Sequence, residues 1–167
     1  MDAMTAILTR RSIRKYTAQP VSDELVKELL QAAMSAPSAG NEQAWQFVVV
    51  RSRQVLDELG KVHPYAPVHG APLVIMVCGD LQRESHKGFW SQDCSAATQN
   101  LLLAAHANGL GAVWCGCYPR EERAAALRKV LGLPEHVVPM ALVVIGYPAE
   151  QKARQDRYDP AKVRVIS

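Results

Sequence analysis

The sequence has no long hydrophobic run, and this absence argues against a helix that crosses a membrane. The leucine-rich stretch 101–107 is short and contains His106, whereas a bilayer crossing needs about 20 consecutive apolar residues. An excess of charge of one sign is also missing, because the formal net charge is +3 and charged residues make up 21% of the chain. Charge this mild and dispersed does not support binding to nucleic acids or to a membrane surface.

Sequence motifs of several enzyme classes are missing as well. No G-x-x-x-x-G-K-[ST] segment indicates nucleotide hydrolysis, and no serine lies in the G-x-S-x-G pattern of a hydrolase. The pair Gly109-x-Gly111 follows a predicted helix, so it indicates a helix end and a turn rather than a dinucleotide site. Neither His63 nor His69 has a carboxylate or cysteine partner at ligand spacing, and no metal site is predicted.

Cysteine is sparse, and its spacing does not match redox or zinc motifs. The four cysteines are Cys78, Cys94, Cys115 and Cys117. Cys115-x-Cys117 lacks the C-x-x-C spacing, and on a strand both thiols would point to the same face, which favours packing over metal or disulfide chemistry. Because Met1 opens almost directly into the first predicted helix, with no signal peptide, we expect reduced thiols in a cytoplasmic protein.

What the sequence does contain is a basic cluster around Ser12, made of Arg10, Arg11, Arg14 and Lys15. The apolar residues at positions 4, 7 and 8 predict a short helix that runs into the cluster, so one interpretation places some of these cations in its last turn, where they suit the helix dipole. The alternative is a phosphate clamp, because arginine forks bind phosphate oxygens in two-point geometry and a serine adds a neutral donor. The cluster alone does not decide between them.

Length and hydrophobic content predict one domain over residues 1–167, because 49% of the chain is hydrophobic and one domain typically has about 100–200 residues. Further helices are predicted over 22–37, 53–59, 91–108 and 120–131, the first with Ser22 as its N-cap, and buried strands over 46–50, 72–78, 112–115 and 139–146. Residues 79–91 are predicted to be a mobile loop that places Phe89 and Trp90 over a site. The segment 162–166 alternates like an edge strand but has no neighbour in sequence, so we expect it to dock on another subunit.

The remaining polar groups have no obvious role in proton transfer or nucleophilic attack, and such groups suit a site that holds a cofactor. They occur in ordered motifs: Arg10-x-Ser12-x-Arg14, then Ala36-Pro37-Ser38-Ala39-x-Asn41-x-Gln43-x-Trp45 before a strand, then Asn100-Leu101-x-Leu103-x-Ala105 with Gly109-Leu110-Gly111 and a strand that ends at Gly116. Together, over nearly the whole chain, these motifs resemble the FMN-dependent nitroreductase family.

This resemblance implies an α+β fold with a central mixed, mainly antiparallel sheet flanked by helices, in an intertwined homodimer whose C-terminal segments are exchanged. It implies an FMN-dependent NAD(P)H oxidoreductase that reduces nitroaromatics, quinones or related electron-poor acceptors by alternating hydride transfer through flavin N5. Other reactions on the same scaffold are flavin reduction, enone reduction and reductive dehalogenation, and a non-catalytic flavin-binding redox sensor is a separate class. No protein side chain is implied as a catalytic residue.

The resemblance also implies cofactor-binding residues. Arg10 would bind the FMN phosphate, Ser12 and Arg11 would contact the phosphate and ribityl region, and Arg14 would reach the pyrimidine end of the flavin, where a cation stabilises the charge of the reduced ring. The backbone at Cys115 and Gly116 would lie along the flavin and donate to N5. A loop of the second subunit would complete each interface site with Pro37, Ser38, Ala39, Asn41 and Gln43.

Two departures from the family pattern affect the phosphate and the active-site cover. Many members carry x-Lys-x-Arg in the tail, whereas the first of these positions is Gln155 here, so Arg157 best fits the phosphate role and Lys152 and Arg154 are alternates. Many members are also longer over the flavin, where this chain has only the loop 81–90. The candidates to line a more open pocket are Phe89, Trp90, Tyr65, His69 and Tyr118. Each of them is equally a candidate for an ordinary surface or packing residue.

Overall fold

The computed structural model describes residues 1–167 and contains a four-stranded sheet with helices on both faces. The strands lie in the order β1-β2-β4-β3, and every pair in the sheet is antiparallel. The α-helices are α1 (Ala3–Thr9), α2 (Asp23–Met34), α3 (Arg53–Val62), α4 (Trp90–Ala107) and α5 (Glu121–Val130), and the strands are β1 (Trp45–Val50), β2 (Leu73–Asp80), β3 (Gly111–Gly116) and β4 (Val137–Gly146). Two short 3₁₀ turns, η1 (Ala39–Asn41) and η2 (Pro160–Lys162), complete the chain. These elements confirm the predicted α+β fold.

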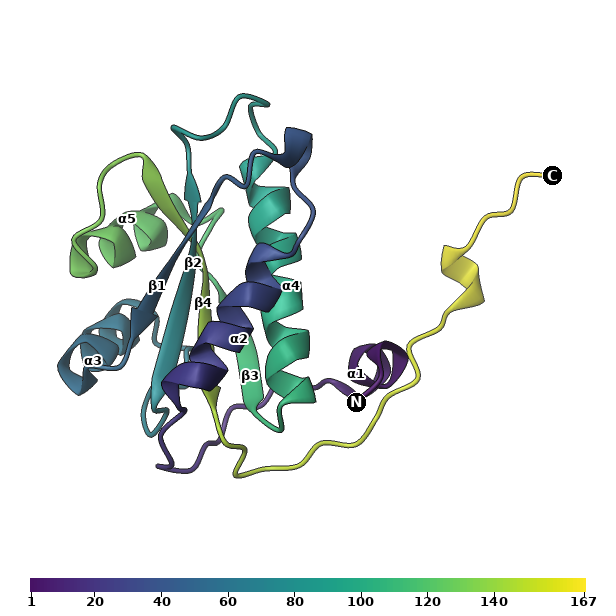
Figure 1. The fold of residues 1–167 in the computed structure, drawn as a ribbon, viewed down its shortest axis with the longest axis horizontal. Coiled ribbons are helices and arrows are strands. Elements are labelled where there is room, and N and C mark those ends of the chain that lie inside the picture. The colour runs from purple at the N-terminus through teal and green to yellow at the C-terminus, as the bar shows by residue number, and fades with distance from the viewer.

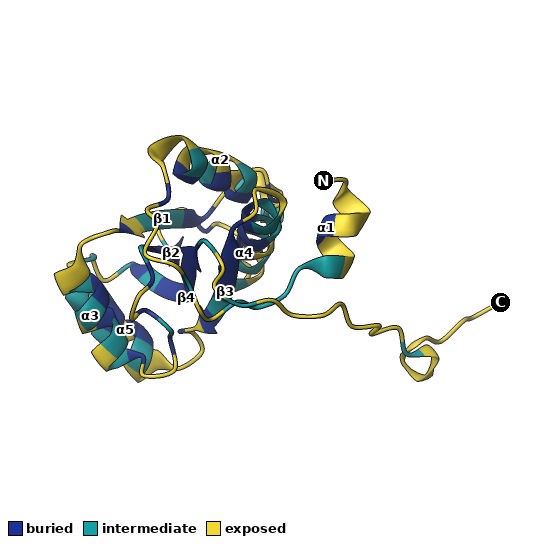
Figure 2. Ribbon diagram, turned by 90° about the horizontal axis from the view of Figure 1, so that it is seen from below, coloured by how far each residue is buried: buried dark blue, intermediate teal, exposed yellow.

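The sheet separates two hydrophobic cores. Helices α2 and α4 cover one face, and α3 and α5 cover the other (Figures 1 and 2). Along the central strand β2, Leu73, Ile75 and Val77 face the first core, whereas Val74 and Met76 face the second. Because both faces are covered, β2 and β4 are apolar runs without polar alternation, which explains why the sequence indicated buried strands.

Helix α1 and the C-terminal tail extend away from this three-layer body (Figure 1). Both are coloured mainly as exposed in Figure 2, and the apolar side chains of Met4, Val165 and Ile166 are 60%, 84% and 85% exposed. The predicted edge strand at 162–166 therefore has no sheet partner within one chain, and its docking on a second subunit stays a prediction.

The N-terminal boundary corrects one of the two interpretations of the basic cluster. Helix α1 ends at Thr9, Arg10 is its C-cap, and no basic residue lies in its last turn. The placement of cations in the last turn was therefore wrong. The helix is only seven residues long because the chain beyond it becomes extended and forms bridges to other segments.

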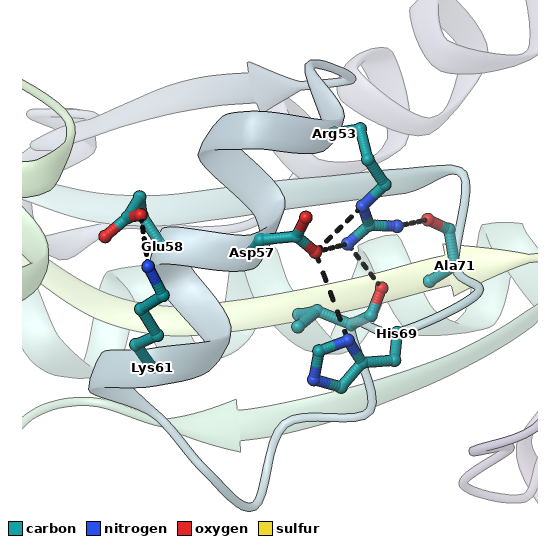
Figure 3. A network of polar contacts seen from close by, with 7 residues as sticks. Arg53, Asp57, Glu58, Lys61, His69 and Ala71 are labelled. Carbon is teal, nitrogen blue, oxygen red and sulfur yellow. Dashed lines mark hydrogen bonds and ion pairs between the residues drawn. The ribbon is translucent and has the colours of Figure 1, made fainter.

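A polar network holds the connection between α3 and β2 against α3 (Figure 3). Arg53 donates from Nη2 to the Val68 carbonyl at 3.0 Å and from Nη1 to the Ala71 carbonyl at 3.3 Å, and its Nη2 lies 2.9 Å from the Asp57 carboxylate. His69 Nδ1 lies 4.0 Å from the same carboxylate. The loop that begins at His63 is thus held near its C-terminal end, at Val68 and Ala71.

No helix combines the length and apolar character that a membrane crossing requires. All four cysteines are free and buried, and Cys115 and Cys117 both belong to the core between the sheet and α3 and α5. The packing role predicted for this pair is confirmed.

Candidate functional site

The basic cluster is held in an extended conformation between β3 and the segment that follows β4. Ser12 forms a parallel bridge with Ala112 of β3, and Tyr16 forms an antiparallel bridge with Pro148. The partly buried Tyr16 hydroxyl lies 2.5 Å from the Ile13 carbonyl and 3.2 Å from the Val144 carbonyl and can donate to either of them. These contacts anchor both ends of the stretch, so the cations between them project from a fixed backbone.

A cavity of about 460 Å³ opens beside this stretch. It is lined by Arg11, Ser12, Arg14, Lys152, Ala153, Gln155 and Arg157, which include four cations and no carboxylate. Like charges this close repel one another, and the repulsion falls when an anion binds between them. The cavity therefore has the charge expected of an anion site, and the tail supplies half of its cations.

Arg10 lies beside this cavity and has no anionic partner. Its guanidinium is partly buried, and its Nε has no hydrogen-bond acceptor. Burial lowers the pKa of Arg10, and the neighbouring charges of Arg157 and Arg11 lower it further. Burial of a cation without a partner is unfavourable, so this position gains from an incoming anion such as a phosphate.

Arg11 and Lys152 fasten the tail to the basic stretch. Arg11 donates from Nε to the Ala153 carbonyl at 2.8 Å, and Lys152 donates from Nζ to the Ser12 carbonyl at 2.7 Å. Glu150 accepts from the Arg14 backbone N–H at 2.5 Å and lies 3.3 Å from Lys152. Sequence reasoning missed Glu150, because a carboxylate far along the chain gives no signal of its contact with Arg14.

The charge of Arg14, which lines the cavity, reaches the end of β3. Burial raises the pKa of the Cys115 thiol to about 11, and the nearby charges of Arg14 and Arg123 oppose that shift. The Cys115 side chain is turned into the core, so only backbone is available to a ligand there. Gly116 is exposed, and a Cβ added to it would meet no atom within 4 Å. Packing within the chain therefore does not require a glycine at position 116.

His63 and Arg123 also meet at Gly116. The Gly116 carbonyl lies 3.1 Å from His63 Nε2 and 3.0 Å from Arg123 Nη1. His63 is buried, and its Nδ1 has no partner. Sequence reasoning considered His63 only as a metal ligand, and Arg123 gave no signal apart from its place in an amphipathic helix.

The predicted loop Pro37–Gln43 lies at the other end of α4 from the basic cluster. The Ala39 backbone N–H donates to Asp93 in the first turn of α4 at 3.0 Å, whereas Thr9 Oγ1 lies 2.8 Å from His106 Nε2 in the last turn. Positions 93 and 106 are separated by about 20 Å along the helix axis. One chain therefore brings together Arg10, Arg11, Ser12, Arg14, Arg157 and the end of β3, but it does not bring the Pro37–Gln43 loop to them.

Comparison with known proteins identifies the family. The model of the nitroreductase family matches residues 7–64 and 63–147, which is most of the chain. The chain belongs to the nitroreductase family.

Three relatives illustrate the range of this nitroreductase family. A protein of Methanothermobacter thermautotrophicus, provisionally named NADH dehydrogenase/NAD(P)H nitroreductase, is 50% identical over 99% of this chain and 87% of its own length. The NADPH-flavin oxidoreductase of Vibrio harveyi is 30% identical over 98% of this chain and 72% of its own length. The crystal structure of a provisionally named nitroreductase in complex with FMN, from Desulfovibrio desulfuricans, is 36% identical with a TM-score of 0.90, over 100% of this chain and 98% of that one.

In this member of the nitroreductase family, the aromatic residues predicted to line an open pocket lie in different places. Trp90 and Tyr118 line one cavity of about 470 Å³, with ring centroids 4.8 Å apart. His69 lies beside α3 instead (Figure 3), Tyr65 is 80% exposed with its ring against His63, and Phe89 is 46% exposed.

Trp90 has a packing role as well as a place in this cavity. Trp90 begins α4, is 8% exposed and lies against Gly79, where a Cβ would come within 2.2 Å of its ring. Its backbone N–H donates to Glu84, and Glu42 accepts from the backbone N–H groups of Ser85 and His86, both at 2.9 Å. These bonds tie the loop 81–89 to the loop at 37–43, and the burial of Trp90 agrees with the alternative that it is a packing residue; the predicted mobility of the loop stays a prediction.

Proposed function

We propose that residues 1–167 act as one FMN-binding domain of an NAD(P)H-dependent oxidoreductase. The observation that carries this proposal is the cavity lined by four cations and no carboxylate, together with the open strand end at Gly116, whose neighbour Cys115 is reached by the charge of Arg14 from that cavity. This pairing fits a ligand with a phosphate at one end and a flat ring at the other. Membership of the nitroreductase family and the relatives named for NAD(P)H and flavin support the same assignment.

The residues present fit FMN in the order that the sequence motifs suggest. Arg10 and Ser12, with a tail cation, would hold the phosphate, and Arg157 and Lys152 are both in place for this role because they line the cavity. Arg154 does not line it. Arg14 lies between the cavity and Cys115, so it would reach the ring. Bound FMN would supply the redox chemistry, by accepting a hydride from NAD(P)H at N5 and passing it to an acceptor.

The chain's own residues would orient the ring and control its electronic properties. The backbone at Cys115 and Gly116 would lie along the ring, with the Gly116 N–H as the donor to N5. Arg14 would favour the reduced ring, because a cation beside a site of developing negative charge stabilises that charge. No side chain in the cavity is required to transfer a proton or to act as a nucleophile.

We infer that the working unit is a homodimer in which each site takes the loop Pro37–Gln43 from the second copy. Two observations support this inference: the distance of that loop from the basic cluster of its own chain, and the apolar side chains exposed on one copy. Ile7 and Met34 are each 50% exposed, and a cavity of about 420 Å³ between α1, α2 and α4 is lined mainly by apolar residues. Apolar surface of this kind is expected where another molecule binds. The tail at 162–166 would dock on the same partner.

Nitroaromatics, quinones and related electron-poor compounds are the proposed acceptors, in a cytoplasmic setting that suits four free thiols. Free flavin is a second candidate acceptor, which the name of the Vibrio harveyi relative favours. Anaerobic titration of the FMN-loaded protein separates these possibilities. NADH or NADPH should bleach the flavin absorbance, and a nitroaromatic, a quinone or free FMN should restore it. Absence of bleaching by either nucleotide would contradict the oxidoreductase and favour a flavin-binding sensor.

A further inference from the structure

We propose that His63 and Arg123 are positioning residues for the flavin, because together they hold the carbonyl of Gly116 at the end of β3. The inference rests on the proposed FMN site and adds two residues that lie outside the cation-lined cavity. Both are positioning residues and not catalytic ones, since they would act on the ring through the backbone of Gly116 and through charge.

Three elements converge on this one carbonyl. His63 is the C-cap of α3, Arg123 lies in the first turn of α5, and Gly116 is the last residue of β3. His63 Nε2 lies 3.1 Å and Arg123 Nη1 lies 3.0 Å from the Gly116 oxygen, and the two donors are 3.5 Å from each other. The loop that follows His63 is fixed by Arg53, which donates to two of its carbonyls (Figure 3). The position of the Gly116 carbonyl is therefore restrained by contacts from both α3 and α5.

The chemistry of the two side chains defines how they act. Arginine can only donate, and a carbonyl oxygen can only accept, so His63 must carry its proton on Nε2 to contact Gly116 favourably. Burial lowers the pKa of His63, and the charge of Arg123 lowers it further, which favours the neutral ring. Nδ1 of that ring is then an acceptor, and it is buried without a partner. A carbonyl needs only one donor, so a second donor and an unpaired nitrogen go beyond what the fold requires.

Gly116 is the residue at which such restraint matters for a ligand. It has no side chain to pack, it is exposed, and the space around its Cα is open. Arg123 also brings a charge to this strand end, since the charges of Arg14 and Arg123 both reach the Cys115 thiol. A flavin ring lying on Gly116 would then have two cations nearby, and both would favour its reduced form.

The test compares four variants in the FMN-loaded protein. Arg123→Gln removes the charge, His63→Leu removes a donor, and His63→Gln restores a donor near Nε2. Arg128→Gln is the matched control, because Arg128 lies on the same helix and also donates to a backbone carbonyl, that of Glu135, at 2.8 Å. The measurements are the FMN dissociation constant, the midpoint potential of bound FMN and the thermal unfolding of the FMN-free protein.

We expect Arg123→Gln to shift the midpoint potential of bound FMN to a more negative value, with no shift in Arg128→Gln. His63→Leu should weaken FMN binding by about threefold to tenfold, and His63→Gln should recover most of that loss. Unchanged potential and FMN affinity in both Arg123→Gln and His63→Leu would overturn the inference, as would a loss of thermal stability without any change at the flavin. If His63→Leu does not fold, the midpoint potential and FMN affinity of Arg123→Gln test the inference on their own. Wild-type protein that binds no FMN would overturn the proposed function and this inference together, whereas normal wild-type behaviour with silent variants overturns the inference only.

Discussion

Gly111 and Gly116 lie at opposite ends of the same strand, and different constraints act on them. A Cβ at Gly111 would lie 2.6 Å from Cγ2 and 2.8 Å from Cβ of Ile13, within the basic stretch, so packing inside the chain excludes a side chain there. At Gly116 the same Cβ would meet nothing within 4 Å. Internal packing explains the first glycine, and the proposed flavin site would explain the second.

Alanine should therefore affect stability at position 111 and FMN binding at position 116. Gly111→Ala should lower the free energy of unfolding by about 1–3 kcal/mol, because Ile13 has to move away from the new methyl group. Gly116→Ala should change that free energy by less than about 0.5 kcal/mol, but should weaken FMN binding by about tenfold. Urea unfolding of the FMN-free protein and FMN titration measure the two quantities. Equal FMN affinity of Gly116→Ala and wild type would contradict the placement of the ring.

Glu150 gives a prediction about acid stability at the same scale. The hydrogen bond from the Arg14 backbone N–H lowers the pKa of Glu150 below its ordinary value of 4.5, and the bond to Lys152 acts in the same direction. A lowered pKa in the folded state stabilises the fold above pH 4.5, and this stabilisation is lost as the pH falls through the folded-state value.

Replacement of the Glu150 carboxylate should reduce the dependence of folding stability on pH at acidic pH. Glu150→Gln should be less stable than wild type at neutral pH, and the difference should shrink as the pH falls below 4.5. Thermal unfolding of the FMN-free protein across this range checks the expectation, with Glu28→Gln on α2 as a control. A constant difference at all pH values would mean that Glu150 acts through packing and not through its charge.

At the scale of elements, α4 decides which parts of the site one chain can assemble. Its first turn holds the loop Pro37–Gln43 through Asp93, and its last turn lies under α1 through His106. The helix is rich in small residues and leucines, which allowed its existence and burial to be predicted. The distance that it sets between the loop Pro37–Gln43 and the basic cluster could not be predicted, because that depends on which segments meet its ends.

The bond between Asp93 and Ala39 should control the loop. Asp93→Ala would leave the Ala39 N–H without its acceptor in a partly buried place, so we expect a loss of about 1–3 kcal/mol in unfolding free energy and weaker FMN retention. Asp93→Asn keeps an oxygen at the same position and should behave nearly as wild type. Denaturant unfolding and FMN release on gel filtration are the measurements. Full FMN retention in Asp93→Ala would argue that the loop does not contribute to the site.

At the scale of the whole molecule, the proposed dimer predicts complementation between two defective chains. Arg10→Ala should damage the phosphate end of a site, and Ala39→Glu should damage the loop given to the partner. Each homodimer should lose most FMN binding. A mixed dimer would contain one site with both defects and one intact site, so after random exchange about a quarter of all sites should recover.

The control for complementation places both substitutions on the same chain instead of on two different chains. A single chain that carries both Arg10→Ala and Ala39→Glu, mixed with wild type, should give mixed dimers in which each site has one defect. Recovery of FMN-dependent activity in the first mixture is the expected result. No recovery there, in protein shown to have exchanged subunits, would mean that each chain builds its own site.

The sequence by itself determined the helices and strands, since their apolar periodicity, the Ser22 cap and the glycine turns are local. It also pointed to the arginines of the cavity, because the motif around Ser12 is continuous in the chain. Only the tertiary structure decided what those arginines face: Lys152 and Arg157 arrive from the tail, Glu150 balances Arg14, and His63 and Arg123 meet at Gly116. Such partners are far apart in sequence, and backbone carbonyls and open space around a glycine leave no mark in residue types.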